Sequence, residues 1–186
     1  DRTLLEPNWT LAQALAPAVT GGARLVIFRE TDLKLAQRRS VIEFVQRAVM
    51  PSGILIAEGE PEFAFETDID GVLLPVGEEI GAAKALLGVK KLVGAIVSTI
   101  AEAESAASAG ADFLLIYVDW SEPEKALRIT ESYSRIGPPL IVGEDVPERL
   151  AAACCQAGAA SCALSAMVMS GPLRTDYIRR YAALIN

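Results

Sequence analysis

The chain has 186 residues, of which 52% are hydrophobic and 22% charged, and this composition suits one globular domain spanning residues 1–186. Its formal charge of −7 and its lack of a basic block argue against binding to nucleic acid or to an anionic membrane. No apolar run approaches the length of a membrane span and the start lacks a signal-peptide layout, so we expect a cytoplasmic protein.

Cysteine and histidine usage narrows the chemistry further. Cys154, Cys155 and Cys162 form an odd set with two adjacent members, which is a poor disulfide framework and favours a reducing compartment. The absence of histidine excludes Ser–His and Cys–His nucleophile pairs and leaves three thiols without a fourth zinc ligand. We therefore expect buried or inert thiols.

Short apolar and β-branched runs recur along the chain and predict seven parallel strands that are covered on both faces. These strands are expected at Arg24–Arg29, Gly53–Glu58, Gly71–Pro75, Leu92–Val97, Phe113–Val118, Leu140–Gly143 and Cys162–Ser165. Helical patterns separate them, at Trp9–Val19, Leu33–Val49, Gly59–Phe65, Glu79–Leu87, Thr99–Ala109, Pro123–Ile136, Pro147–Ala157 and Pro172–Leu184. Thr99 with Glu102 has the spacing of a capping box, and glycines 110, 137 and 158 each follow a predicted helix.

Alternating strands and helices predict right-handed crossovers and a parallel sheet. A helix precedes the first predicted strand, which suggests an eighth strand upstream of Asp1. The fold class expected is therefore α/β, a (β/α)₈ TIM barrel with seven of its strands in this sequence. The alternative is an open, doubly wound sheet of seven strands.

An ordered series of segments supports the barrel. The segments are Gly22–Thr31, Leu55–Glu58, Asp70–Leu74, Ala109–Phe113, Ala157–Ala159 and Leu164–Ala166. In this order they resemble thiamine-phosphate synthase and its TenI-like relatives across the whole chain. The resemblance implies a transferase of thiamine biosynthesis, in which Mg²⁺ holds the pyrophosphate of an aminopyrimidine. That pyrophosphate leaves, and the nitrogen of a thiazole phosphate attacks the resulting carbocation. The implied partners are thus phosphorylated small molecules.

The resemblance also assigns roles to particular residues. Arg29 matches the family's substrate-binding arginine, and Lys125 lies at the family lysine's spacing from Asp112, so both are catalytic candidates. Glu58 and Glu78 stand where two magnesium-binding aspartates are expected. Backbone amides for a phosphate are expected after the last strands of a barrel, at Gly143, Ser165 and Ala166.

Other positions depart from the family pattern. Ile27 and Thr31 replace a glutamine and a lysine, Ala57 replaces an asparagine, Ile96 replaces a serine, Glu122 and Glu124 replace two threonines, and Gly143-Glu144 replaces Gly-Gly. Each carboxylate at ~6 Å from a phosphate charge costs roughly 3 kcal/mol at an effective dielectric constant of ~20. The acidic replacements therefore work against phosphate binding.

Two functions remain open. The first is a divergent thiamine-phosphate synthase that uses Mg²⁺. The second is a barrel without catalysis that serves as a binding or interaction module, as such domains do when fused to larger proteins. A TenI-like isomerase is disfavoured because that relative uses a histidine. Arg29 paired with Glu58, and Lys125 exposed on a helix, are the structural alternatives to ligand binding. Barrels of this size often form homo-oligomers, although no particular residue argues for one here.

Overall fold

The computed structural model describes residues 2–5, 7–30, 32–50, 52–170 and 174–185. Its seven strands are β1 Leu25–Phe28, β2 Ile54–Glu58, β3 Gly71–Leu74, β4 Leu92–Ile96, β5 Phe113–Tyr117, β6 Leu140–Gly143 and β7 Ser161–Cys162. They form one parallel sheet in the sequential order β1 to β7. The predicted strand set is confirmed, although β7 is shorter than expected and begins one residue earlier.

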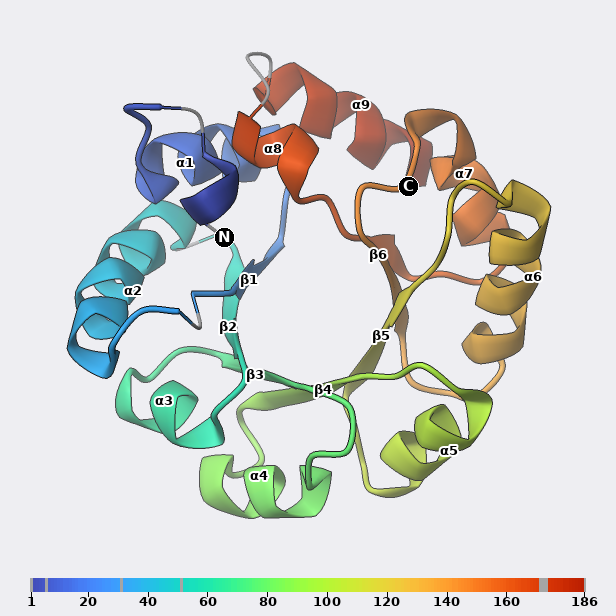
Figure 1. The fold of residues 1–186 in the computed structure, drawn as a ribbon, viewed down its shortest axis with the longest axis horizontal. Coiled ribbons are helices and arrows are strands. Elements are labelled where there is room, and N and C mark those ends of the chain that lie inside the picture. Colours follow the sequence, from blue (N-terminus) through green and yellow to red (C-terminus); the bar gives the residue numbers. More distant parts are fainter. Residues whose placement is uncertain (1, 6, 31, 51, 171–173, 186) are drawn as a thin grey trace.

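Helices follow the strands and surround the curled sheet (Figure 1). They are η1 Arg2–Leu4, α1 Leu11–Gly21, α2 Leu35–Val49, α3 Pro61–Glu66, α4 Ile80–Leu87, α5 Ile100–Ser108, α6 Pro123–Ser134, α7 Glu148–Gln156, α8 Ala166–Ser170 and α9 Arg174–Ile185. The short helix α8 was not expected from the sequence. The predicted start of the last helix at Pro172 lies outside the described residues, as does Thr31.

The sheet curls into a barrel with a seam. β1 and β7 lie at the two ends of the strand order, and no pairing joins them among the described residues. A doubly wound sheet would reverse its strand order and carry helices on both faces. The sequential order with helices outside confirms the barrel class and rules out that alternative.

Local signals explain where the helices begin and end. In the predicted capping box, Thr99 Oγ1 accepts the Glu102 N–H at 3.2 Å, and Glu102 Oε2 accepts the Thr99 N–H at 3.2 Å. Thr10 and Gln13 form a second capping box at the start of α1. Gly158 follows α7 with φ +98°, a left-handed conformation that glycine adopts without steric cost.

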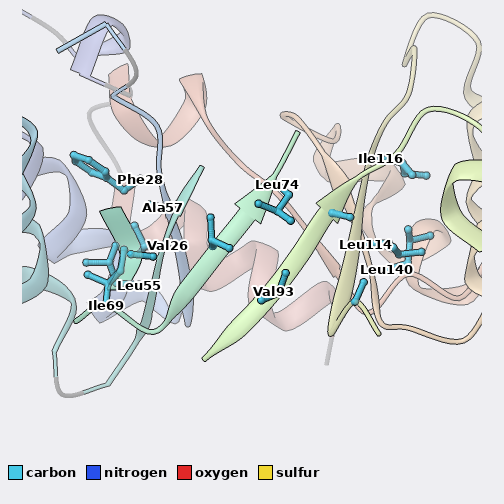
Figure 2. Packing of buried hydrophobic residues seen from close by; sticks show 14 of the residues in the cluster. Val26, Phe28, Leu55, Ala57, Ile69, Leu74, Val93, Leu114, Ile116 and Leu140 are labelled. Atoms are coloured by element: carbon cyan, nitrogen blue, oxygen red, sulfur yellow. The ribbon is translucent and has the colours of Figure 1, made fainter. Parts of the chain in front are cut away.

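Side chains alternate between the two faces of each strand. Residues such as Val26, Leu55, Ala57, Leu114 and Ile116 face outward and pack in the layer that the strands share with the helices (Figure 2). Their neighbours form a second cluster of strand residues together with Ala163, which directly follows β7, and this cluster lies inside the barrel. Its buried members are Ile56, Leu73, Phe113, Leu115 and Ile141, with Leu25, Ile27, Leu92, Ile96 and Ala163 partly buried against them.

Candidate functional site

Three polar side chains converge at the carboxyl end of the barrel because of this alternation. Arg29, Glu58 and Tyr117 each come two residues after an inward-facing residue, namely Ile27, Ile56 and Leu115. The same period of two therefore turns all three toward the barrel axis. This end is the face where barrels of this architecture carry their active sites. We call it the mouth, and define it by Arg29, Glu58, Tyr117 and the loop residues Glu144 and Asp145.

The guanidinium of Arg29 is engaged on all three nitrogens. Its Nε donates to Glu58 Oε2 at 2.6 Å, its Nη1 to Glu144 Oε1 at 2.6 Å, and its Nη2 to the Tyr117 hydroxyl at 2.5 Å. The side chains of Glu58 and Glu144 are only 17% and 34% exposed, so both ion pairs are partly shielded from water. The positive charge of Arg29 thus faces the negative charges of Glu58 and Glu144, so these three side chains together carry a net negative charge.

This environment changes how Arg29 and Tyr117 titrate. Burial works against the charged guanidinium, but the hydrogen bond and charge of Glu58, with Tyr117 and Glu144, raise the Arg29 pKa above its ordinary value. Burial also raises the pKa of Tyr117, although the charge of Arg29 opposes that shift. Arg29 therefore stays charged and Tyr117 stays protonated at neutral pH. Tyr117 was not among the predicted site residues, although the period of two along β5 also turns it inward.

The predicted phosphate-binding amides already have an acceptor. Asp145 Oδ1 accepts the Ser165 N–H at 2.7 Å, and Asp145 Oδ2 accepts the Ala166 N–H at 3.0 Å. Hydrogen bonds from backbone N–H groups to a carboxylate are charge-assisted and strong. Gly143, the third predicted phosphate contact, pairs with Tyr117 across β5 and β6, and a Cβ there would lie 3.3 Å from the tyrosine ring. The contact of Asp145 with these amides was not predicted from the sequence.

The structure places Lys125 outside this network. It lies in the first turn of α6, where its side chain is 60% exposed and its Nζ is 3.3 Å from Glu122 Oε2. It is not among the residues that line the cavity beside Arg29. Glu122 provides no side-chain cap to α6, whereas Asp119 accepts the Ser121 N–H at 2.9 Å.

Glu58 and Glu78 do not form a joint metal site. Glu58 binds Arg29, whereas Glu78 is exposed in a separate cleft of about 480 Å³ between α3 and α4, beside Glu60, Glu62 and Glu79. Among the described residues, no group of three or more Asp, Glu, Cys or His side chains is arranged to hold a metal ion. With Glu58 held by Arg29 and Glu78 in another cleft, these two side chains as placed do not fit the Mg²⁺ that the family resemblance implies.

The three cysteines are free thiols, two of them in α7 and one in β7. Cys154 is buried, and Cys155 and Cys162 are partly buried. The hydrogen bond with Cys154, together with burial, raises the pKa of Cys162. A thiol with a raised pKa is a poor nucleophile, so Cys162 is unreactive at neutral pH.

These observations define an α/β barrel whose polar groups gather at the carboxyl ends of its strands. Residues 3–117 match the family model described as thiamine monophosphate synthase. The chain belongs to this thiamine-phosphate-synthase-like family of thiamine biosynthesis.

Individual relatives agree with the family assignment. The chain is 30% identical over 178 residues to a thiamine biosynthesis bifunctional protein ThiM/ThiE of Symbiobacterium thermophilum, a match that covers 88% of this chain and 36% of that protein. It is 28% identical to thiamine-phosphate synthases of Syntrophomonas wolfei and Nitrosococcus oceani. Those matches cover 68% and 97% of this chain, and 61% and 86% of the respective synthases. The chain thus spans less than two thirds of the bifunctional protein and of the Syntrophomonas synthase.

A solved structure supports the fold. Thiamine phosphate pyrophosphorylase from Pyrococcus furiosus superimposes with a TM-score of 0.84 at 20% identity, over 100% of this chain and 94% of that one. At this identity the likeness concerns the fold alone. Within the described residues, no helix is both long and apolar enough to span a membrane.

Proposed function

We propose that this chain is a thiamine-phosphate-synthase-like barrel that does not couple the two phosphorylated substrates and instead serves as a binding or interaction module. The observation that carries this proposal is the carboxylate of Asp145 on the N–H groups of Ser165 and Ala166. A phosphate would have to displace a hydrogen-bonded acceptor of the same charge sign to reach them.

The state of Arg29 supports the same conclusion. A leaving pyrophosphate needs an available cation to stabilise its developing charge. Glu58, Glu144 and Tyr117 occupy the three nitrogens of Arg29. Moving either carboxylate away from Arg29 would break an ion pair that is partly shielded from water, so the network resists opening. Lys125 is exposed and paired with Glu122.

The second candidate is a divergent synthase that couples an aminopyrimidine diphosphate to a thiazole phosphate with Mg²⁺. Family membership favours it, as does the position of Arg29 at a strand end in the mouth. In this case Glu58 would have to leave Arg29, and Glu78 would have to approach it, before either could hold the metal ion.

One experiment separates the candidates. The purified chain is incubated with both phosphorylated substrates and Mg²⁺, beside the Nitrosococcus oceani synthase as the active control, and thiamine phosphate is measured. We expect product only in the control. Formation of thiamine phosphate by this chain above the protein-free level would refute the proposal.

A variant tests the physical cause. Asp145 has φ +53°, a conformation that glycine adopts freely, so Asp145→Gly removes the carboxylate without straining the loop. We expect this variant, and not the parent chain, to gain thermal stability when inorganic phosphate is added. Equal stabilisation of both proteins would show that Asp145 does not block the amides.

A further inference from the structure

Three thiols gather where α7 turns into β7. Cys154 and Cys155 lie in the last turn of α7, and Cys162 is the last residue of β7. The chain folds back on itself between them, because the Ala159 N–H donates to the Cys154 carbonyl at 3.0 Å. This turn therefore brings the cysteine of the strand beside those of the helix.

The pleat of β7 turns Cys162 toward the helix. Its neighbour Ala163 packs inside the barrel, so Cys162 faces the opposite side, where it packs against the cluster that contains Cys154. The Cys162 thiol is hydrogen-bonded to Cys154, and Cys155 is close enough to Cys162 for a second hydrogen bond. All three are free thiols, and two thiols in contact meet the first geometric requirement for a disulfide.

The hydrogen bond between Cys154 and Cys162 distinguishes these two thiols. It lowers the pKa of Cys154 below the ordinary value of 9.0, although burial opposes that shift. Burial and the charge of Cys154 instead raise the pKa of Cys155. The thiolate is the form of cysteine that reacts, so Cys154 is the nucleophile of this group and Cys162 holds the proton between them.

Burial limits the reagents that can reach Cys154. This residue is fully buried, whereas Cys162 beside it is partly exposed. A bulky oxidant such as glutathione disulfide cannot touch a sulfur in this position. Hydrogen peroxide is little larger than water and can pass beside Cys162. The packing therefore favours a small peroxide as the oxidant.

We propose that Cys154 and Cys162 are a modification site, at which hydrogen peroxide forms a reversible disulfide between α7 and β7. The Cys154 sulfur attacks one peroxide oxygen and the O–O bond breaks, which gives a sulfenic acid and a hydroxide that takes up a proton. The Cys162 sulfur then attacks the Cys154 sulfur, the S–O bond breaks, and the hydroxyl group leaves with the Cys162 proton as water. Two thiols are thus oxidised while one peroxide is reduced to two water molecules.

The first step prepares the second. The raised pKa of Cys162 is caused chiefly by its hydrogen bond to Cys154. Oxidation converts the Cys154 thiolate to a neutral sulfenic acid, so Cys162 then releases its proton more readily. In the reducing compartment that the cysteine usage favours, such disulfides are usually transient. The inference goes beyond the proposed function, because it does not depend on what the mouth binds.

Counting thiols tests the site. The purified, reduced chain is exposed to hydrogen peroxide, denatured and alkylated, and its mass is measured with and without later reduction by dithiothreitol. Because the chain has three cysteines, we expect three alkyl groups before oxidation, one after it and three again after reduction. Fragmentation should place the single group on Cys155. Three groups after oxidation, a single group on Cys154 or Cys162, or a disulfide that joins two chains would each overturn the inference.

Variants separate the roles of the three cysteines. Cys155→Ser is the matched control, and it should lose both remaining thiols as fast as the parent chain loses two. Cys162→Ser keeps a hydroxyl donor beside Cys154, so we expect oxidation to stop at a sulfenic acid on Cys154, which dimedone traps. Cys154→Ala, a small apolar replacement at a buried position, should slow the loss of thiols at least about tenfold. Equally fast loss without Cys154, or a dimedone adduct on Cys155, would refute the role of Cys154.

Discussion

Asp70 and Asp112 belong to segments that resemble the thiamine-phosphate synthase family. Both bind backbone N–H groups at the end of the barrel opposite the mouth. Asp70 Oδ2 accepts the Leu55 N–H at 2.8 Å, and Asp112 Oδ2 accepts the Val93 N–H at 2.7 Å. Asp112 also accepts from Lys84 Nζ at 2.8 Å. Both carboxylates lie at the amino ends of strands, away from the mouth, and in barrels such positions serve stability. The resemblance of these segments to the family therefore indicates a shared fold and says little about the chemistry at the mouth.

Replacing Asp112 tests this role. Asp112→Ala removes the acceptor of the Val93 N–H and the partner of Lys84, so we expect the free energy of unfolding to fall by about 1–3 kcal/mol. Asp112→Asn keeps one side-chain oxygen and should cost less. Urea unfolding measures both, with Glu104→Ala in α5 as a surface control. A loss no greater than that of the control would assign Asp112 no structural role.

The site could be predicted only in part from the sequence. Arg29 and Glu58 were identified from the family resemblance, and the alternation of side chains along a strand explains why both turn toward the barrel axis. The positions of Glu144 and Asp145 could not be predicted in the same way, because they lie in a loop, where side chains do not alternate regularly between two faces. Asp145 has φ +53°, and this conformation carries its carboxylate to Ser165 and Ala166. Nothing in the local sequence requires that conformation.

Helices and strands that are long enough to show a complete repeat of apolar side chains were predicted more accurately than short ones. The helix that follows Thr99 begins at its predicted capping box, because two hydrogen bonds fix its start. α8 covers only Ala166–Ser170 and β7 only Ser161–Cys162. Five residues complete less than two helical turns, and two residues show no alternation, so neither leaves a periodic pattern to detect.

Strand β4 allows a test of packing inside the barrel. A Cβ built on Gly94 would lie 2.1 Å from Cζ of Phe113, so the phenyl ring occupies the space that this glycine leaves. We expect Gly94→Ala to destabilise the chain by about 1–3 kcal/mol through overpacking. Thermal and denaturant unfolding measure the loss.

A double variant and a control make this test specific. Adding Phe113→Leu removes the ring atoms that meet the new methyl group, so it should cost less beside Gly94→Ala than in the parent chain. Gly81→Ala in α4 meets no atom within 4 Å and should be neutral or slightly stabilising. Additive losses for Gly94→Ala and Phe113→Leu would show that the two residues do not compete for space.

At the scale of the whole molecule, the fold is shared with a protein of low sequence identity. The fold superimposes on the Pyrococcus furiosus pyrophosphorylase with a TM-score of 0.84 at 20% identity. Strand order depends on apolar runs and turns, which many sequences satisfy, so it could be predicted from this one. The charge of the mouth depends on a few side chains that the fold does not require. For this reason the family could be recognised, and of the groups that occupy Arg29 and the loop amides only Glu58 was anticipated, as the structural alternative to ligand binding at Arg29.

Because of the four tyrosines, the free energy of unfolding should fall at alkaline pH. Burial raises the pKa of Tyr117, Tyr133, Tyr177 and Tyr181 above the ordinary value of 10.0. Above that pH the unfolded chain loses phenolic protons that the folded chain retains. Because the unfolded state then binds fewer protons, the tyrosine contribution to the unfolding free energy is fully present below pH 10.0 and declines as pH rises through the folded-state values.

Tyr181 provides the variant for this prediction, since its buried hydroxyl donates to the Val146 carbonyl. Tyr181→Phe should lose about 1 kcal/mol at neutral pH and should show a shallower decline of stability above pH 10.0, because one ionising group is gone. Denaturant midpoints between neutral and strongly alkaline pH measure both effects, with absorbance following phenolate formation. Parallel curves for the variant and the parent chain would mean that Tyr181 has the same pKa in the folded and unfolded states, and that the buried hydroxyl contributes only its hydrogen bond.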